Sequence, residues 1–357
     1  MENIHEDPNK PTDDTTSGTN RQNPPLADNQ NFASKMSDHV TDWAGVERLE
    51  GFNLGDVFSE ALKRHTSEEV EEYFTVGTPS TTPPIEKVNT GWPRPWMFLR
   101  TFLGAAFVYF IFVQAWKEFD NINLVPGLII VGSFAVPVSA LIFFFEMNAR
   151  HNVSLYQIIR LVFLGGIVSM TISLMFFQIS DSLELDWLGA SLAGLMEEPG
   201  KMLALAIVVN ATRYPYTLNG LLFGAAIGTG FAAFESAGYA LYAGLYNSED
   251  MLDSIMLRGM LAPFGHIVWT GMCAGALWKV KGRHPFHIGM LKDPRFYRVF
   301  LIAVVMHMIW NSPIYLPFYL KYIILGSVAW IIVFSLIQSG LKQIMAEKAA
   351  ALSSSSG

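Results

Sequence analysis

The sequence has little charge and almost no cysteine. Charged residues make up 15% of its 357 residues, whereas about 25% is usual in a soluble globular chain, and 51% are hydrophobic. The mean hydropathy is +0.30, which excludes an ordinary soluble domain as a description of the whole chain. The only cysteine, Cys273, lies in an apolar run, so an intrachain disulfide is also excluded.

Several familiar signals are missing as well. The first twenty residues contain no apolar core, so we expect no cleavable signal peptide. The motifs HExxH and GxSxG, a GxGD-type aspartate pair and a phosphate-binding loop do not occur. The net charge of −7 comes mainly from the N-terminal region and predicts no affinity for nucleic acid.

The N-terminal region differs in composition from the rest of the chain. Residues 1 to about 37 are rich in Pro, Asn, Asp, Thr and Gln, which predicts disorder. Residues 43–74 predict two short amphipathic helices, and Thr66–Glu69 is typical of a helix start. Residues 77–95 contain many prolines and predict a linker. We therefore expect an acidic, mostly disordered and partly helical cytoplasmic extension over residues 1–95.

Beyond Trp96 the sequence predicts an all-α, polytopic bundle of about eight transmembrane helices. The expected domain covers residues 96–345, and a C-terminal tail covers residues 346–357. Tryptophans near several predicted ends are typical of the membrane interface. The expected spans are 97–116, 124–145, 156–178, 187–209, 219–245, 255–278, 298–317 and 319–342.

The loop charges predict an orientation, because cytoplasmic loops carry an excess of Lys and Arg. The loops after the second, fourth and sixth spans hold the cations Arg150, Arg213, Lys279, Lys281, Arg283, Lys292, Arg295 and Arg298. The opposite loops hold the acids Asp181, Glu184, Asp186, Glu249, Asp250 and Asp253. Lys117, Arg258 and Lys321 go against this trend. We expect a multi-pass protein of the inner (cytoplasmic) membrane with both termini in the cytoplasm.

Ionisable residues nevertheless occur within the predicted spans, where they are expensive and mark functional sites. Each of the four residues Glu198, Glu235, His266 and His307 lies ten or eleven positions from the predicted outer end of its span. At 1.5 Å per residue this depth is roughly 15–17 Å, about the middle of a ~30 Å hydrocarbon core. The count predicts that these side chains meet in one buried site.

The spacing around these residues supports a shared site. Glu197 and Lys201 are four residues apart and can pair on one helix face. The other neighbours at helical spacing are Phe231 and Tyr239 around Glu235, Trp269 and Thr270 after His266, and Trp310 and Asn311 after His307. Taken singly, each histidine also fits a helix–helix hydrogen bond, and the Glu197–Lys201 pair also fits a structural role.

Two forms of hydrolytic chemistry fit this set. In the first, Glu235, His266 and His307 bind Zn²⁺, and Glu198 or Glu197 acts as the general base. In the second, which is metal-free, Glu198 activates water, and Asn311 or a histidine stabilises the oxyanion. Both forms predict that a peptide bond is cut inside the membrane.

These motifs, in this order, resemble the signature of the PrsW-type intramembrane proteases, which are distant relatives of the CAAX-processing and bacteriocin-immunity proteases. The resemblance covers roughly residues 97–342. It implies a metallo- or glutamic-type membrane protease and a membrane protein substrate, with an anti-sigma-factor-like regulator as one example. The residues that carry it are Glu197-Glu198-x-x-Lys201, Phe231-x-x-x-Glu235-x-x-x-Tyr239, His266-x-x-Trp269 and His307-x-x-Trp310-Asn311.

Two other functions remain open at this point. Intramembrane Glu and His also form proton relays, so a proton-coupled transporter or channel is one alternative. A non-catalytic scaffold that binds substrate helices is the other. The expected partners are a membrane protein substrate and the lipid bilayer, while the oligomeric state is left open.

Overall fold

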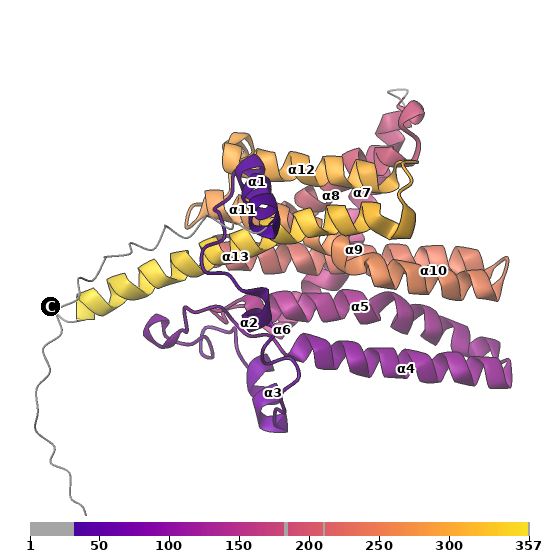
Figure 1. Cartoon of the computed structure of the whole chain (residues 1–357), viewed down its shortest axis with the longest axis horizontal. Coiled ribbons are helices and arrows are strands. Elements are labelled where there is room, and N and C mark those ends of the chain that lie inside the picture. Colours follow the sequence, from indigo (N-terminus) through magenta and orange to yellow (C-terminus); the bar gives the residue numbers. More distant parts are fainter. Residues whose placement is uncertain (1–31, 182–184, 210, 356–357) are drawn as a thin grey trace, which may run out of the picture.

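The computed structural model describes residues 32–181, 185–209 and 211–355, and every regular element in these ranges is a helix. The long helices α4, α5, α9, α10 and α13 run roughly alongside one another, and α13 extends beyond the bundle at one end (Figure 1). This arrangement confirms the all-α bundle predicted from the sequence.

Within the described residues, six helical stretches are long and apolar enough to cross a membrane. They comprise α4 (Met97–Phe119), α5 (Val125–Met147), α6 with α7 (Leu155–Arg160 and Gly166–Asp181, joined by a π-helical turn at Leu161–Gly165), α9 (Thr217–Gly244), α10 with α11 (Ser248–Leu261 and His266–Lys281) and α13 (Leu320–Ser355). The other two predicted segments are helical as α8 (Leu192–Val208) and α12 (Pro294–Asn311) but fall outside these six. The chain is a multi-pass membrane protein.

The expected span at 255–278 lies within one of the six stretches, Ser248–Lys281, but it is not one regular α-helix, which corrects the prediction of a continuous segment. A 3₁₀ turn at Ala262–Phe264 separates α10 from α11, and it contains Pro263. Proline donates no backbone hydrogen bond and crowds the preceding turn. Gly265 follows at φ −113° and ψ −131°, outside the helical region. His266 is therefore the first residue of a helix, and counting helical residues from Ile255 does not give its depth.

Closely spaced glycines bring α9 and α11 together. Gly224 and Gly228 are one helical turn apart on α9 and face α11. A Cβ atom at Gly224 would lie 2.2 Å from the carbonyl oxygen of Thr270, and one at Gly228 would lie 2.5 Å from that of His266. Small residues at this spacing let two membrane helices approach closely. The contact holds the start of α11 against the helix that carries Glu235.

We expect Gly228→Ala to lower the free energy of unfolding by about 1–3 kcal/mol, because the added methyl group meets backbone that cannot move aside independently. Thermal unfolding in detergent measures the change. Gly238→Ala on the same helix is the matched control, because no atom of the described residues lies within 4 Å of a Cβ at that position. Equal stability of the two variants would contradict the proposed close contact.

Between residues 32 and 96, three short α-helices precede the bundle: α1 (Phe32–Ala44), α2 (Leu54–Val57) and α3 (Ser67–Phe74). The predicted disorder of residues 32–37 is wrong, because these residues form the start of α1, whereas residues 1–31 lie outside the described residues. The predicted helix start is confirmed, since the side chain of Thr66 accepts a hydrogen bond from Glu69 N and the Glu69 side chain accepts one from Thr66 N.

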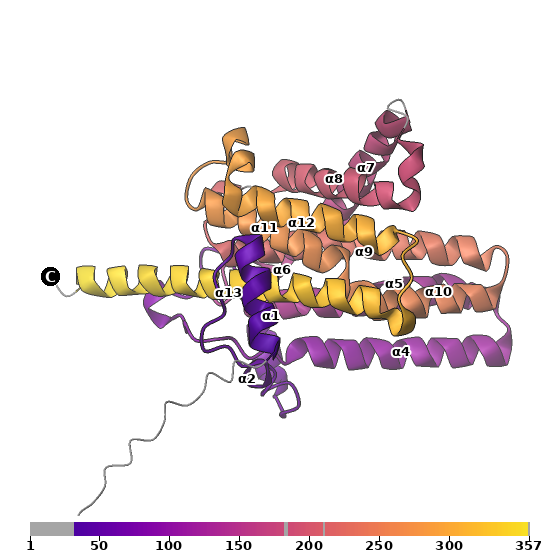
Figure 2. The ribbon, with the colours of Figure 1, turned by 45° about the horizontal axis from the view of Figure 1, so that its top comes forward.

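The segment after α1 is bound to α13. Gln338 Oε1 accepts a hydrogen bond from Glu50 N at 2.9 Å, and Gln338 Nε2 donates to the carbonyl of Arg48 at 2.8 Å. The same segment also contacts α11, where Lys279 Nζ donates to Glu47 Oε1 at 3.2 Å. Helix α1 itself lies across α13 (Figure 2).

The boundaries of the predicted domains stay predictions, although α13 continues through Ser355 into the expected tail.

Candidate active site

Helix α8 carries the two adjacent acids and the lysine, and two glycines place it close to its neighbours. A Cβ atom at Gly194 would lie 2.6 Å from the backbone nitrogen of Met308 on α12. One at Gly200 would lie 2.4 Å from Ser173 Oγ on α7. Because neither position has room for a side chain, α8 packs directly against both helices. Its acidic face thereby lies beside His307.

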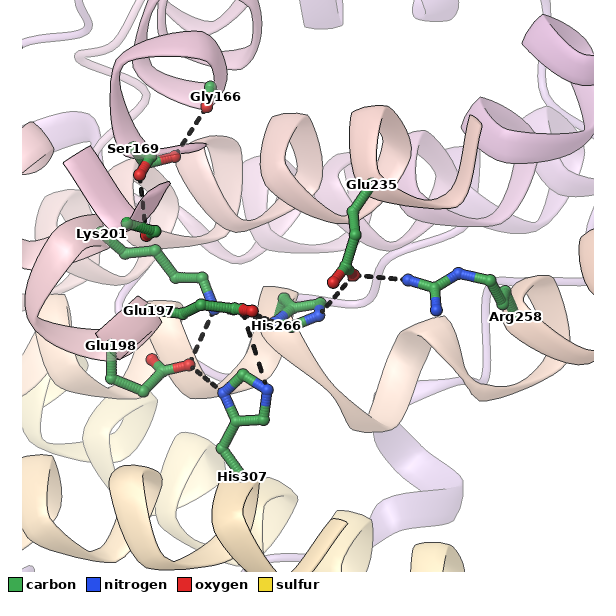
Figure 3. Close-up of polar contacts among 10 residues, drawn as sticks. Gly166, Ser169, Glu197, Glu198, Lys201, Glu235, Arg258, His266 and His307 are labelled. Atoms are coloured by element: carbon green, nitrogen blue, oxygen red, sulfur yellow. Dashed lines mark hydrogen bonds and ion pairs between the residues drawn. The ribbon is translucent and has the colours of Figure 1, made fainter. Parts of the chain in front are cut away.

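Lys201 lies at the centre of the charged groups and is fully buried (Figure 3). Its Nζ donates to Glu198 Oε1 at 2.8 Å and to Glu197 Oε2 at 3.3 Å, and it lies 2.8 Å from His266 Nδ1. It also lies 4.1 Å from the ring centroid of Phe231. The Glu197–Lys201 pair predicted from the helical spacing is therefore present, and Glu198 shares the same cation.

Each imidazole is held by one carboxylate and turns its second nitrogen toward Glu197. His307 Nδ1 lies 2.9 Å from Glu198 Oε1, and His266 Nε2 lies 3.0 Å from Glu235 Oε2. The remaining nitrogens, His307 Nε2 and His266 Nδ1, lie 3.8 and 3.9 Å from Glu197 Oε2. Hydrogen bonds of this kind fix the orientation of histidines that bind metals.

Three of these residues can hold a metal ion. Glu197, His266 and His307 each offer a ligand atom, and these atoms lie within 4.8 Å of one another. Ligand atoms in tetrahedral zinc sites are separated by about 3.3–3.5 Å, so the donor set and its spacing fit an ion after a small contraction. Glu235, which the sequence analysis assigned to the metal, is not in this group.

Arg258 has a role that was not predicted from the sequence, where it stood out only as a cation against the loop-charge trend. Its guanidinium pairs with Glu235 Oε2, and its Nε donates to Ser236 Oγ at 2.9 Å. It also lies 4.4 Å from the ring centroid of Tyr239. The available signal was its position inside the predicted span 255–278, because an arginine within a span implies a buried acidic partner.

Aromatic rings pack around both histidines. Trp269 is fully buried, with its ring centroid 5.6 Å from that of His266, 4.7 Å from that of His307 and 5.3 Å from that of Trp310. The ring of Phe231 lies 5.1 Å from that of His266 on another side. These contacts restrict the two imidazoles and exclude water from their flanks.

A cavity of about 550 Å³ opens onto this cluster. Of the two adjacent acids, Glu197 lines the cavity, whereas the side chain of Glu198 is 1% exposed behind it. Leu174 on α7 and Leu257 on α10 also line it and reach the outer surface of the bundle. The other predicted site residues in its wall are Phe231, Glu235, Tyr239, His266, Trp269, His307, Trp310 and Asn311.

The comparisons with known proteins agree with this chemistry. A family model described as PrsW family intramembrane metalloprotease matches residues 154–337, more than half of the chain and all of the predicted site residues. Comparison with curated proteins gives no match, and comparison with solved structures gives none either. The chain therefore belongs to the PrsW family of intramembrane metalloproteases and is a membrane-embedded protease.

Proposed function

We propose that this protease hydrolyses a peptide bond in or next to the transmembrane segment of a membrane protein, such as an anti-sigma-factor-like regulator. The observation that carries the proposal is the convergence of Glu197, His266 and His307 on one cavity within the helix bundle. A carboxylate and two imidazoles from three different helices, facing a space large enough for a peptide segment, provide the groups that peptide hydrolysis needs.

The same three residues would hold the metal, for which we propose zinc, because a carboxylate and two imidazoles suit Zn²⁺. When bound, Zn²⁺ polarises a carbonyl group and acidifies water. Lys201 Nζ lies among these ligands, 2.8 Å from His266 Nδ1. Two cations repel each other at this distance, so metal binding requires the ammonium to withdraw toward Glu198. The Oε2 atom of Glu198 is buried and has no hydrogen-bond partner among the described residues.

The roles of the acids follow from what each one contacts. Both described hydrogen bonds of Glu235 use Oε2, so Oε1 remains available at the cavity wall to take the proton from water and return it to the leaving amine. Glu198 positions His307 through the bond to Nδ1. We assign to Asn311 the role of donor to the developing oxyanion, which is supported by its position in the wall of the same cavity.

Substrate would enter from the side of the bundle rather than from its ends. Leu174 on α7 and Leu257 on α10 border both the cavity and the outer, lipid-facing surface. An apolar border of this kind suits a transmembrane segment that moves in from the bilayer. The path between α7 and α10 is therefore the proposed entrance.

We also propose that the protein lies in a prokaryotic cytoplasmic membrane with both termini in the cytoplasm. The support is the excess of Lys and Arg in the loops that follow α5, α8 and α11. The opposite loops are acidic, although Glu184 lies outside the described residues. Both ends of the chain join the same side of the bundle as the basic loops under this assignment.

The proposed substrate class is tested by identifying the peptide termini in two kinds of cells. One produces the wild-type protein and the other produces the Glu197→Gln variant. We expect mass spectrometry to find new termini within or beside transmembrane segments only with the wild type, because the variant lacks the cavity carboxylate. Glu249→Gln, which changes an exposed acid on α10, is the control and should behave like wild type. Identical termini from the wild type and Glu197→Gln would contradict the proposal.

A further inference from the structure

A second, basic cavity lies at the end of the bundle where α5 and α11 end and α9 begins. It has a volume of about 440 Å³ and is bordered by Arg150, Arg213, Arg283 and Glu347. Arg150 follows the last residue of α5 by three positions, Arg213 precedes α9 by four, and Arg283 follows α11 by two. The three arginines thus come from separate connections and border one cavity at the level where the membrane helices end.

The positive charge of this cavity is only partly compensated. Glu347 on α13 pairs with Arg283 at 2.8 Å and accepts a hydrogen bond from the Tyr216 hydroxyl at 3.0 Å. Among the described residues, neither Arg150 nor Arg213 forms an ion pair with a carboxylate. Three cations therefore face one acid, and that acid is already engaged by Arg283.

Arg150 is held in place by one hydrogen bond, and one of its other donors is unpaired in the described part of the chain. Its Nη1 donates to the carbonyl of Pro83, which fixes the side chain in the wall of the cavity. Its Nε is buried and has no hydrogen-bond partner in the described part of the chain. A buried donor without a partner is unfavourable, so Arg150 would be stabilised if a shift of its side chain brought Nε to an acceptor in the cavity.

We propose that this cavity binds a phosphate group, carried either by the headgroup of an anionic lipid or by a free phosphate compound. Guanidinium groups match the geometry and charge of phosphate oxygens, and basic pockets at the ends of membrane helices are typical binding sites for lipid headgroups. The bound phosphate would accept hydrogen bonds from Arg150 and Arg213, while Glu347 remains paired with Arg283.

Occupancy of this site would also attach the N-terminal extension to the protease domain. The linker residues Pro79, Thr82 and Pro83 form one wall of the same cavity. A phosphate between the arginines would neutralise their mutual repulsion and strengthen the contact between Arg150 and Pro83. The ligand therefore stabilises the packed arrangement of linker and bundle.

The experiment titrates the full-length protein in a neutral, phosphate-free detergent and follows the midpoint of thermal unfolding. One arm adds phosphatidylglycerol, a second adds inorganic phosphate, and a third adds phosphatidylcholine as the zwitterionic reference. We expect saturable stabilisation by phosphatidylglycerol or by inorganic phosphate. Stabilisation by the lipid alone identifies a headgroup as the source, whereas stabilisation by inorganic phosphate as well identifies a site for free phosphate compounds.

The double variant Arg150→Gln/Arg213→Gln should bind the stabilising anion with an apparent affinity at least about tenfold weaker than that of wild type. The control double variant Lys292→Gln/Arg295→Gln removes two positive charges just before and at the start of α12. Its affinity should stay within about twofold of wild type, since neither residue is among those that border the cavity. If the first double variant does not fold, Arg213→Gln alone serves, because its side chain is exposed. The proposal is overturned if neither anion stabilises wild type, if phosphatidylcholine stabilises it equally, or if both double variants lose affinity alike.

Discussion

Cleavage of a membrane substrate should fall by roughly 10²–10⁴-fold in each of the variants Glu197→Gln, His266→Ala and His307→Ala. These residues supply the three ligand atoms that lie within 4.8 Å of one another at the cavity, so each change removes part of the reacting centre. Glu198→Gln should have a smaller effect, about 10–100-fold, because this residue acts by holding His307. Initial rates with purified protein in liposomes measure all four.

His284→Ala is the matched control, because it removes an exposed histidine in the loop after α11. Its rate should equal that of wild type, and circular dichroism should show the same helix content for every variant. Undiminished cleavage by His266→Ala or His307→Ala would remove the imidazoles from the mechanism. An effect of Glu198→Gln as large as that of Glu197→Gln would assign Glu198 a direct role in the chemistry.

The second large effect concerns stability. Lys201→Met should lower the free energy of unfolding by about 3–5 kcal/mol, because it leaves buried carboxylates without their cation. Glu198, at 2.8 Å from Nζ and 1% exposed, loses its shortest cationic contact. Glu197 loses the same partner at 3.3 Å. Chemical denaturation in detergent, with chelator present, measures the change.

Lys63→Met provides the comparison, since its side chain is 59% exposed beside Glu60 and its loss should change stability by less than about 1 kcal/mol. Added Zn²⁺ should restore part of the stability of Lys201→Met, because a bound cation supplies the missing positive charge. If Lys201→Met is as stable as Lys63→Met in the presence of chelator, the lysine does not neutralise the acidic pair as proposed.

Much of the fold could be predicted because lipid restricts what a chain can do. Long apolar stretches must form helices in a bilayer, so residues 97–342 indicated a helical bundle without further information. The same restriction made the ionisable side chains conspicuous. Because charged groups at that depth must find partners, Glu198, Glu235, His266 and His307 could be assigned to one site before any geometry was known.

The division of roles among these side chains could not be predicted, because it depends on how each helix is rotated. Glu197 and Glu198 are adjacent and point about 100° apart, so contacts elsewhere on α8 decide which of them faces the cavity. Those contacts are made by Gly194 with α12 and by Gly200 with α7. Sequence periodicity does not reveal which neighbour a glycine will meet.

The break before His266 and the partner of Glu235 were missed for a related reason. Apolar residues continue through Pro263, so the run appeared to be one span, although proline there ends α10. The break lets Arg258 on α10 and His266 on α11 approach the same carboxylate from two directions. For Arg258, the charge that contradicted the loop pattern thus indicated a carboxylate partner within the bundle.

The most direct test of the proposed site is the metal content of the purified protein, measured by inductively coupled plasma mass spectrometry. We predict about one Zn²⁺ per chain for wild type and for Glu235→Gln, and near-complete loss for Glu197→Gln and for His266→Ala. The opposite pattern, with metal kept by Glu197→Gln and lost from Glu235→Gln, would contradict this assignment of the ligands. Fully active wild type that contains no metal would contradict the metal site itself.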